Sequence, residues 1–338
     1  PGGTMRIRRL TSTKLLFLAA VGLVCLVGGE AMAQQSGHNI PGDAGLQSGS
    51  QAPPGVYVGN LYYTYPTSKL ANDSGEKVNR DGSLRVTFDS VFVSWVTNRK
   101  ILGANIGGQV ALPFYKNRIE AFSLEAKSNF AVSDIYVQPI NLGWHLKRAD
   151  VIAGYGVYMP TGDYKAGGRG NTGLGMFSHE LSLGSTVYLS ENRMWHAAAL
   201  FQYEMHGRKP GIDIKVGDMV TIEGGVGKTF VKMIPEKGPL VTNVGLAAYT
   251  QFKATGDSGT GINPLLRGLK DRVFGIGPEV NVYIPQLKGT IGARYIPEFG
   301  ARNTTQGQTF VVTFALQLKS WMPPPPAPPA PAAAPAGN

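Results

Sequence analysis

Three sets of residues have the types that enzymes and binding proteins use for chemistry. Gly227-Lys228-Thr229 resembles the end of a phosphate-binding loop, but Ile222 stands where such a loop needs its first glycine. Ser178 and His179 are adjacent, so in a strand they point to opposite faces and form no nucleophile-base pair. The histidines show no metal-ligand spacing and are expected to be hydrogen-bonded wall residues. They are His38, His145, His179, His196 and His206. We therefore expect neither an enzyme nor a bound metal or cofactor.

Alternating apolar and polar residues show which elements would position these side chains. In Ser133 to Leu146 the apolar residues recur at every second position, and their parity changes at Gln138-Pro139. This pattern predicts a strand with a bulge at the proline, which cannot donate to a strand ladder. After the short turn 147–149, residues 150–159 alternate again, and turn residues follow from Pro160. The remaining chain repeats this hairpin.

Twelve segments carry the strand pattern, and their connections alternate between short turns and longer loops. The segments are 55-65, 84-96, 101-112, 133-146, 150-159, 178-189, 194-206, 216-230, 239-253, 273-284, 289-296 and 306-319. An even number of strands, with short turns at one end and long loops at the other, is typical of outer-membrane barrels. The 45 glycines and the charged fraction of 16% also favour one large all-β unit. The sequence therefore predicts a twelve-stranded antiparallel transmembrane outer-membrane β-barrel.

Residues 194–206 show how the two faces of a strand would divide. Trp195, Phe201 and Tyr203 share an apolar face that suits lipid, whereas Gln202 and Glu204 share the opposite, polar face. The two aromatic ends of the apolar face are about 20 Å apart along the membrane normal, for a rise of about 3.4 Å per residue and a tilt near 40°. This spacing fits an anchor at each membrane interface. The last segment divides in the same way, with Phe310 on its outer face.

Charged residues in the middle of strands are expected to face the lumen, because Arg or Lys on the lipid face costs about 2–4 kcal/mol at the midplane. The candidate lumen and substrate-path residues are Arg85, Asp89, Asp134, Gln138, Glu180, Glu204, Glu223, Glu279 and Arg294. Acids outnumber bases among them, which disfavours an anion-selective pore. Two interpretations stay open: the charges pair across the lumen with Arg294 as the hub, or they contact substrate.

The two ends of the chain differ from the barrel in composition. Residues 1–33 have a basic region, an apolar run and the cleavage pattern Ala31-Met32-Ala33, which predict a secretory signal peptide. An uncleaved anchor or a lipid on Cys25 are weaker alternatives. Residues 34–54 are expected to be extended, either in the periplasm or in the lumen. The barrel is assigned to 55–321, and the Pro/Ala-rich tail 322–338 is expected to be disordered. Both mature termini are expected on the periplasmic side.

Several fragments resemble the outer-membrane protein family named for the meta-cleavage (MetA) pathway of phenol degradation. They are residues 45–49, Pro53-Pro54-Gly55, residues 134–139, residues 160–164, Tyr203-Glu204 and Gly217-Asp218. The resemblance implies a transporter-like barrel associated with uptake of aromatic or other hydrophobic compounds, and it brings no catalytic residues. The chain departs from many outer-membrane proteins in its tail, because their last strand usually ends the chain on an aromatic residue.

The function expected from the sequence is a channel or transporter for small hydrophobic or aromatic compounds. It would act by binding these compounds and letting them diffuse through a narrow polar lumen. The alternative is a structural or interaction protein with a closed barrel. A lipid-acting barrel enzyme would need a serine and a histidine within hydrogen-bond reach. The expected partners are outer-membrane lipid, the substrate and, for the tail, a periplasmic protein. The formal charge of +10 alone does not predict nucleic-acid binding, since no arginine-aromatic cluster accompanies it.

Overall fold

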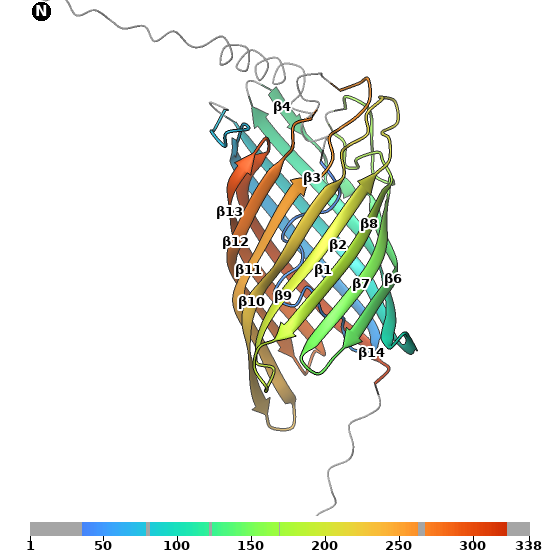
Figure 1. Cartoon of the computed structure of the whole chain (residues 1–338), viewed down its shortest axis with the longest axis vertical. Coiled ribbons are helices and arrows are strands. Elements are labelled where there is room, and N and C mark those ends of the chain that lie inside the picture. Colours follow the sequence, from blue (N-terminus) through green and yellow to red (C-terminus); the bar gives the residue numbers. More distant parts are fainter. Residues whose placement is uncertain (1–35, 79–81, 122–123, 169, 263–267, 323–338) are drawn as a thin grey trace, which may run out of the picture.

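A closed antiparallel barrel forms the wall of the protein (Figure 1). The computed structural model describes residues 36–78, 82–121, 124–168, 170–262 and 268–322. The predicted signal peptide, Cys25 and residues 323–338 of the predicted tail lie outside them. No helix in these ranges is long and apolar enough to cross a bilayer.

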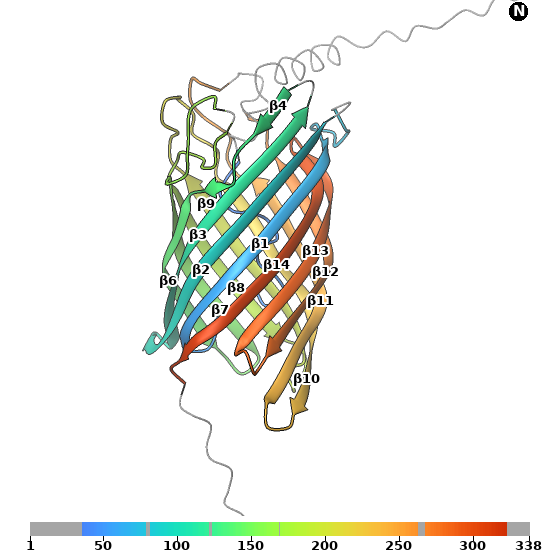
Figure 2. The ribbon, with the colours of Figure 1, turned by 180° about the vertical axis from the view of Figure 1, so that it is seen from behind.

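Twelve long strands make the wall, and the two short strands β4 (Leu124–Lys127) and β5 (Ala131–Val132) pair only with β3. The long strands are β1 (Gly55–Leu70), β2 (Ser83–Ile101), β3 (Ala104–Ala121), β6 (Ile135–His145), β7 (Ala149–Met159), β8 (Ser178–Tyr188), β9 (Trp195–His206), β10 (Met219–Ile234), β11 (Gly238–Lys253), β12 (Arg272–Ile284), β13 (Gly289–Arg302) and β14 (Thr305–Ser320). Each pairs with its neighbours in sequence, and β1 closes the barrel on β14 (Figure 2). The predicted twelve-stranded barrel is confirmed.

The faces of the strands follow the alternation in the sequence. In β9, Trp195 and Phe201 are exposed on the outer wall, whereas His196, Gln202 and Glu204 are buried inside. Because the outer wall of the barrel meets lipid and the inner wall meets polar groups, a period of two in polarity satisfies both sides at once. The register slips in β6 between Val137 and Ile140, which confirms the bulge predicted at the proline.

The two ends of the described chain lie at opposite ends of the barrel. Trp321 donates its backbone N–H to Pro54 O at the end of the barrel that carries the short turns. His38 instead contacts Ser178 and Glu204, where strands β8 and β9 meet the long loops. The expectation that both termini lie on one side therefore does not hold for the described residues, because the segment before β1 runs the length of the barrel.

Candidate functional site

Residues 36–54, hereafter the plug, lie inside the barrel and cross it from the long-loop end to the short-turn end. The plug contacts β9 through Asn39, β12 through Leu46 and β6 through Gln51. It folds into compact turns, in which Ser48 N–H bonds Gly45 O and Ser50 N–H bonds Gln47 O. The sequence left open whether this segment hangs in the periplasm or enters the lumen, and the structure places it in the lumen.

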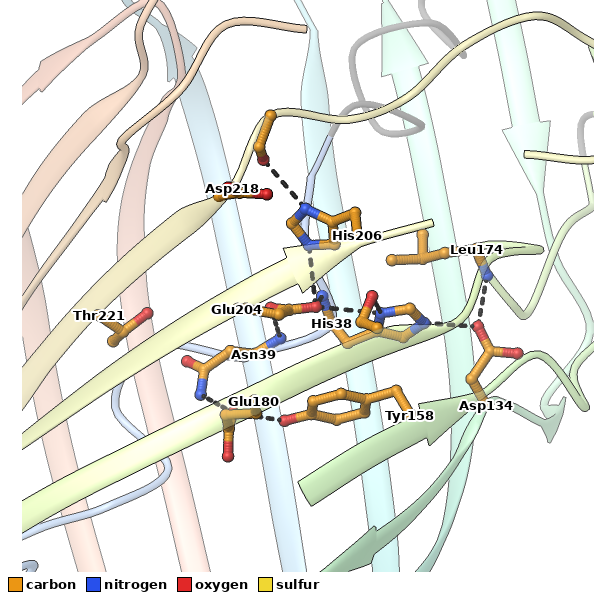
Figure 3. A network of polar contacts seen from close by, with 12 residues as sticks. His38, Asn39, Asp134, Tyr158, Leu174, Glu180, Glu204, His206, Asp218 and Thr221 are labelled. Carbon is orange, nitrogen blue, oxygen red and sulfur yellow. Dashed lines mark hydrogen bonds and ion pairs between the residues drawn. The ribbon is translucent and has the colours of Figure 1, made fainter. Parts of the chain in front are cut away.

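At the long-loop end, His38 ties the plug to the wall (Figure 3). Its Nε2 lies 2.9 Å from Asp134 Oδ2, and its Nδ1 lies 3.1 Å from Glu204 Oε1 and 2.8 Å from Ser178 Oγ. The ring stacks on Tyr158 at 4.8 Å between centroids. Since an ionised carboxylate only accepts hydrogen bonds, a doubly protonated imidazolium would satisfy both acids at once. We call this arrangement the mouth latch.

A second layer of contacts extends the mouth latch into the lumen. Glu204 accepts a hydrogen bond of 3.0 Å from the Asn39 backbone N–H. Glu180 accepts from the Asn39 side chain at 3.1 Å, and from the hydroxyl groups of Tyr136 at 2.9 Å and Tyr158 at 3.1 Å. Both carboxylates are buried, and a buried carboxylate is stable only when its oxygens find such partners. The plug therefore supplies hydrogen bonds that the acidic wall requires.

The long loops pack over the same region. Asp134 accepts hydrogen bonds from Gly162 N–H at 2.9 Å and from Leu174 N–H at 2.6 Å, so one carboxylate joins the loop 160–177 to the plug. From the loop after β9, Lys209 donates to Leu174 O at 2.7 Å. Burial lowers the pKa of Lys209 to about 8, although the charges of Asp134 and Asp257 oppose this shift. The loops and the mouth latch thus close the long-loop end together.

In the middle of the barrel, Arg294 joins the plug to the wall. Its guanidinium donates to Gly42 O at 3.1 Å and to Asp43 O at 2.8 Å, and its Nε lies 3.4 Å from Glu279 Oε2. Glu279 also accepts from Leu46 N–H at 3.2 Å. Arg294 is therefore a hub of charge pairing in the lumen, and it bonds the plug as well as a wall acid.

Leu46 fixes the position of the plug by shape. Its side chain is fully buried, with an exposed fraction of 0%, and its methyl groups face Gly225, Gly227 and Gly245. A Cβ atom at Gly225 or Gly245 would lie 2.9 Å from Leu46 Cδ2, so only glycine leaves room at these positions. The three glycines form a notch in β10 and β11 that receives one leucine.

Near the short-turn end, Ser50 and Gln51 hold the plug to acidic and neutral side chains of the wall. Ser50 Oγ donates to Asp150 at 2.8 Å, and the Gln51 amide donates to Asn141 Oδ1 at 2.8 Å. Beside this part, a cavity of about 460 Å³ opens between residues 45–48 and strands β10 to β13. Asn243 and Asn281 line this cavity together with the charged side chains of Glu279 and Arg294.

The structure divides the candidate residues named from the sequence between the two sides of the wall. Seven of them face the lumen: Asp134, Gln138, Glu180, Glu204, Glu223, Glu279 and Arg294. Among these, Gln138 bonds Asn141 rather than the plug, at 3.1 Å, and Glu223 accepts from the plug at Ala44 N–H, at 3.0 Å.

The expectation that Arg85 and Asp89 face the lumen is wrong. In β2 the even positions point inward, since Ser90 is buried, whereas Val91 and Val93 are exposed on the outer wall. Both odd and even positions of β2 carry apolar residues, so the alternation in the sequence did not identify the inner face. On the outer wall, Asp89 accepts a hydrogen bond from Asn60.

Several residues of the lumen were not identified from the sequence. Glu298 accepts hydrogen bonds from Tyr65 at 2.6 Å and Tyr249 at 2.8 Å, but the expected strand ended before it, at residue 296. Arg294 and Glu298 are both at even positions. If the expected strand had extended beyond residue 296, the alternation that places Arg294 inside would also have placed Glu298 there. His38 and His206 were set aside for lack of metal-ligand spacing. The role of His38 comes from contacts between distant segments, which spacing along the chain does not reveal, whereas His206 lies 3.0 Å from Glu204, two residues away on the same strand.

A serine, a histidine and an aspartate do meet in the mouth latch, as the enzyme alternative requires. Ser178, His38 and Asp134 form a chain of hydrogen bonds. However, Ser178 has an exposed fraction of 0% and lies inside the barrel rather than on its lipid face. Glu204 also occupies the ring nitrogen that would have to take the serine proton. With a carboxylate on each ring nitrogen, a doubly protonated His38 would have no free lone pair to act as a general base.

Metal binding finds no support in the described part of the chain, in which no group of three or more His, Cys, Asp or Glu side chains could hold an ion. The polar groups of the lumen bond the plug and one another instead. Together, the plug and the polar groups of the wall can set the width and the charge of a path through the barrel.

The wall and the lumen together define an outer-membrane β-barrel filled by its own N-terminal segment. The chain belongs to the family described as Putative MetA-pathway of phenol degradation, whose model matches residues 67–314. The resemblance seen in the sequence is thereby confirmed.

Solved structures show a similar fold. An outer membrane channel from Pseudomonas putida F1 is 14% identical, with 82% of this chain and 99% of that chain covered and a TM-score of 0.65. The β domain of the Bordetella autotransporter BrkA is more distant, at 11% identity, 78% and 99% coverage and a TM-score of 0.45. A search of curated protein sequences found no match.

Proposed function

We propose that this protein is a channel for small hydrophobic or aromatic compounds, which pass by binding and diffusion along a narrow lumen. The observation that carries the proposal is the plug, which fills the lumen yet is held mainly by hydrogen bonds to separate wall residues. Such contacts can break and re-form one region at a time. The description of the family, with its reference to phenol degradation, supports aromatic compounds as the substrate class.

The charge of the lumen narrows the range of substrates. Wall acids outnumber the single wall base, Arg294, among the seven inward-facing candidates, and Glu298 adds another acid. Because a buried carboxylate repels anions, the path should favour neutral or cationic molecules over anionic ones. Phenols and other uncharged aromatic compounds meet this condition. The acids would act by holding the plug and by excluding anions, without any covalent bond being made or broken.

A closed barrel that serves as a structural or interaction protein is the second candidate. The specific observation in its favour is that the plug is anchored at the mouth, in the middle and near the lower end. The two candidates differ in whether the plug has to move. Only the channel requires the mouth latch to open during uptake.

A cross-link across the mouth latch separates the two candidates. In the double variant His38→Cys/Ser178→Cys, the replaced groups are His38 Nδ1 and Ser178 Oγ, which lie 2.8 Å apart, so a short bis-methanethiosulfonate reagent should link the two cysteines and tie the plug to β8. We expect cells treated with this reagent to lose uptake of a radiolabelled aromatic compound, down to the level of cells without the gene, and to recover it after reduction. The single variants His38→Cys and Ser178→Cys are the controls. Undiminished uptake by fully cross-linked protein would contradict a channel gated by this plug.

We also propose that residues 1–33 are a cleaved signal peptide, that the long loops face outside and that the tail 323–338 lies in the periplasm. Long extracellular loops and short periplasmic turns are the rule for such barrels. Lys165 lies exposed in a long loop, and Glu191 lies exposed in a short turn. A membrane-impermeant maleimide should label Lys165→Cys in whole cells but reach Glu191→Cys only after lysis. The reverse pattern would invert the proposed orientation.

A further inference from the structure

Cations form a row across three neighbouring strands on the outer wall, near the long-loop end. In the strand register Arg85 of β2 is opposite Arg118 of β3, and Arg118 is opposite Lys127 of β4. Lys116, two residues before Arg118, is on the same face. All four residues are exposed, and the Arg118 side chain keeps 64% of its surface accessible. We call these four residues the basic row.

The basic row lies directly beyond the apolar band of the outer wall. Phe114 is two residues before Lys116 and stacks on Phe130, with ring centroids 5.7 Å apart. Leu112 and Val132 are exposed beside this pair. In a bilayer the aromatic residues at the edge of the apolar band mark the level of the lipid headgroups. The basic row is therefore at the depth of the headgroups or just above them.

The strand register places like charges directly opposite each other. Residues directly opposite each other in an antiparallel pair have Cβ atoms about 5 Å apart, and like charges in such positions repel. Arg85 and Arg118 are such a pair, and so are Arg118 and Lys127. An anion held between the strands would turn this repulsion into shared attraction. Arginine is well suited to this role, since its planar fork binds phosphate oxygens in pairs.

Two acidic residues near the basic row, Glu120 and Asp89, lie beyond it and below it, and each contacts a neighbouring side chain. Glu120 pairs with Arg118 at 2.6 Å and lies two residues beyond it on β3, farther from the apolar band than the cations. Asp89, below the row, is engaged by Asn60. Among the described ion pairs none includes Arg85, Lys116 or Lys127. The order from the apolar band outward is thus cations first and acids second, which matches a lipid headgroup with its phosphates closest to the acyl chains.

We propose that the basic row binds the phosphate groups of a membrane lipid in the leaflet at the long-loop end, with the acyl chains against Phe114, Phe130 and Leu112. The occupant is a lipid rather than free phosphate, because the apolar side chains continue directly from the cations on one face of the wall. This site would fix the depth and rotation of the barrel in its membrane at strands β2 to β4.

Binding of a fluorescent bisphosphorylated lipid A to the purified barrel in neutral detergent micelles tests the proposal. The triple variant Arg85→Gln/Arg118→Gln/Lys127→Gln should bind roughly 100-fold more weakly, since each cation near an anionic lipid surface adds a similar amount to the binding free energy. The matched control Lys232→Gln/Lys237→Gln/Lys288→Gln removes the same charge from exposed positions at the short-turn end and should bind normally. The charge-preserving variant Arg85→Lys/Arg118→Lys should keep most of the affinity.

Two further measurements distinguish lipid from other anions. Dephosphorylated lipid A should bind the native barrel as weakly as the phosphorylated lipid binds the triple Gln variant. Inorganic phosphate at millimolar concentration should not displace the lipid. The proposal is overturned if the triple Gln variant, shown to be folded by its gel migration without heating, binds the phosphorylated lipid as the native barrel does. It is also overturned if the control variant loses affinity equally, or if free phosphate competes at low concentration.

Discussion

A variant that lacks residues 36–52 is expected to form an open pore, with a single-channel conductance roughly an order of magnitude above that of the full chain. The plug fills the lumen in the structure, and its removal is expected to open an aqueous path. The wall does not depend on the plug for closure, because β1 pairs with β14 from Gly55 to Leu70. Recordings in planar bilayers measure the effect.

The open pore should also select for cations. Deleting the plug removes the hydrogen-bond donors of Asn39, Ala44 and Leu46, and so exposes the carboxylates of Glu204, Glu223 and Glu279 to water. Ionised carboxylates around a water-filled path attract cations and repel anions. Reversal potentials in a salt gradient measure this selectivity, which should fall when the salt concentration rises.

Removal of residues 323–338 is the matched control for the deletion, since it shortens the chain by a similar length outside the described barrel. Its conductance should equal that of the full chain. A correctly folded variant without residues 36–52 that still conducts no better than the full chain would show that the long loops, rather than the plug, close the path.

Replacement of Arg294 by glutamine is expected to cost about 3–5 kcal/mol of stability, the usual penalty for removing one partner of a buried ion pair. Arg294 has only 9% of its surface exposed, so Glu279 would be left buried beside Asn281 without a charged partner. The plug would also lose the two hydrogen bonds that its carbonyl groups at Gly42 and Asp43 accept. Urea unfolding of the barrel in lipid vesicles measures the change in free energy.

The conservative control for this change is Arg302→Gln, at an exposed arginine on the same strand, β13, near the long-loop end. Its effect should lie within about 0.5 kcal/mol, as for most surface substitutions. A cycle that combines Arg294→Gln with deletion of the plug isolates the contribution of the plug contacts. If Arg294→Gln costs the same with and without the plug, Arg294 stabilises the wall alone and is not the hub that joins the two.

Alternation along single strands was enough to predict the wall. The inner and outer faces of β9 followed directly from Trp195, Phe201 and Glu204, because lipid on one side and polar groups on the other impose a period of two. The bulge at Pro139 followed as well, since proline cannot donate to the ladder. In β2, however, apolar residues occupy both parities, and the side on which Arg85 and Asp89 lie was decided by pairing with β1 and β3.

The contents of the lumen were decided only by the tertiary structure. The acids Glu180, Glu204 and Glu279 could be placed on the inner face from the sequence, but their partners could not. The plug residues that bond these acids lie more than 140 residues away along the chain, as for Asn39 and Glu180. The plug has no period of its own, because a segment surrounded by wall on every side meets polar groups and glycine notches in all directions. The sequence by itself therefore determined a barrel with an acidic lumen, and only the closed barrel decided that the lumen is filled by the segment before it.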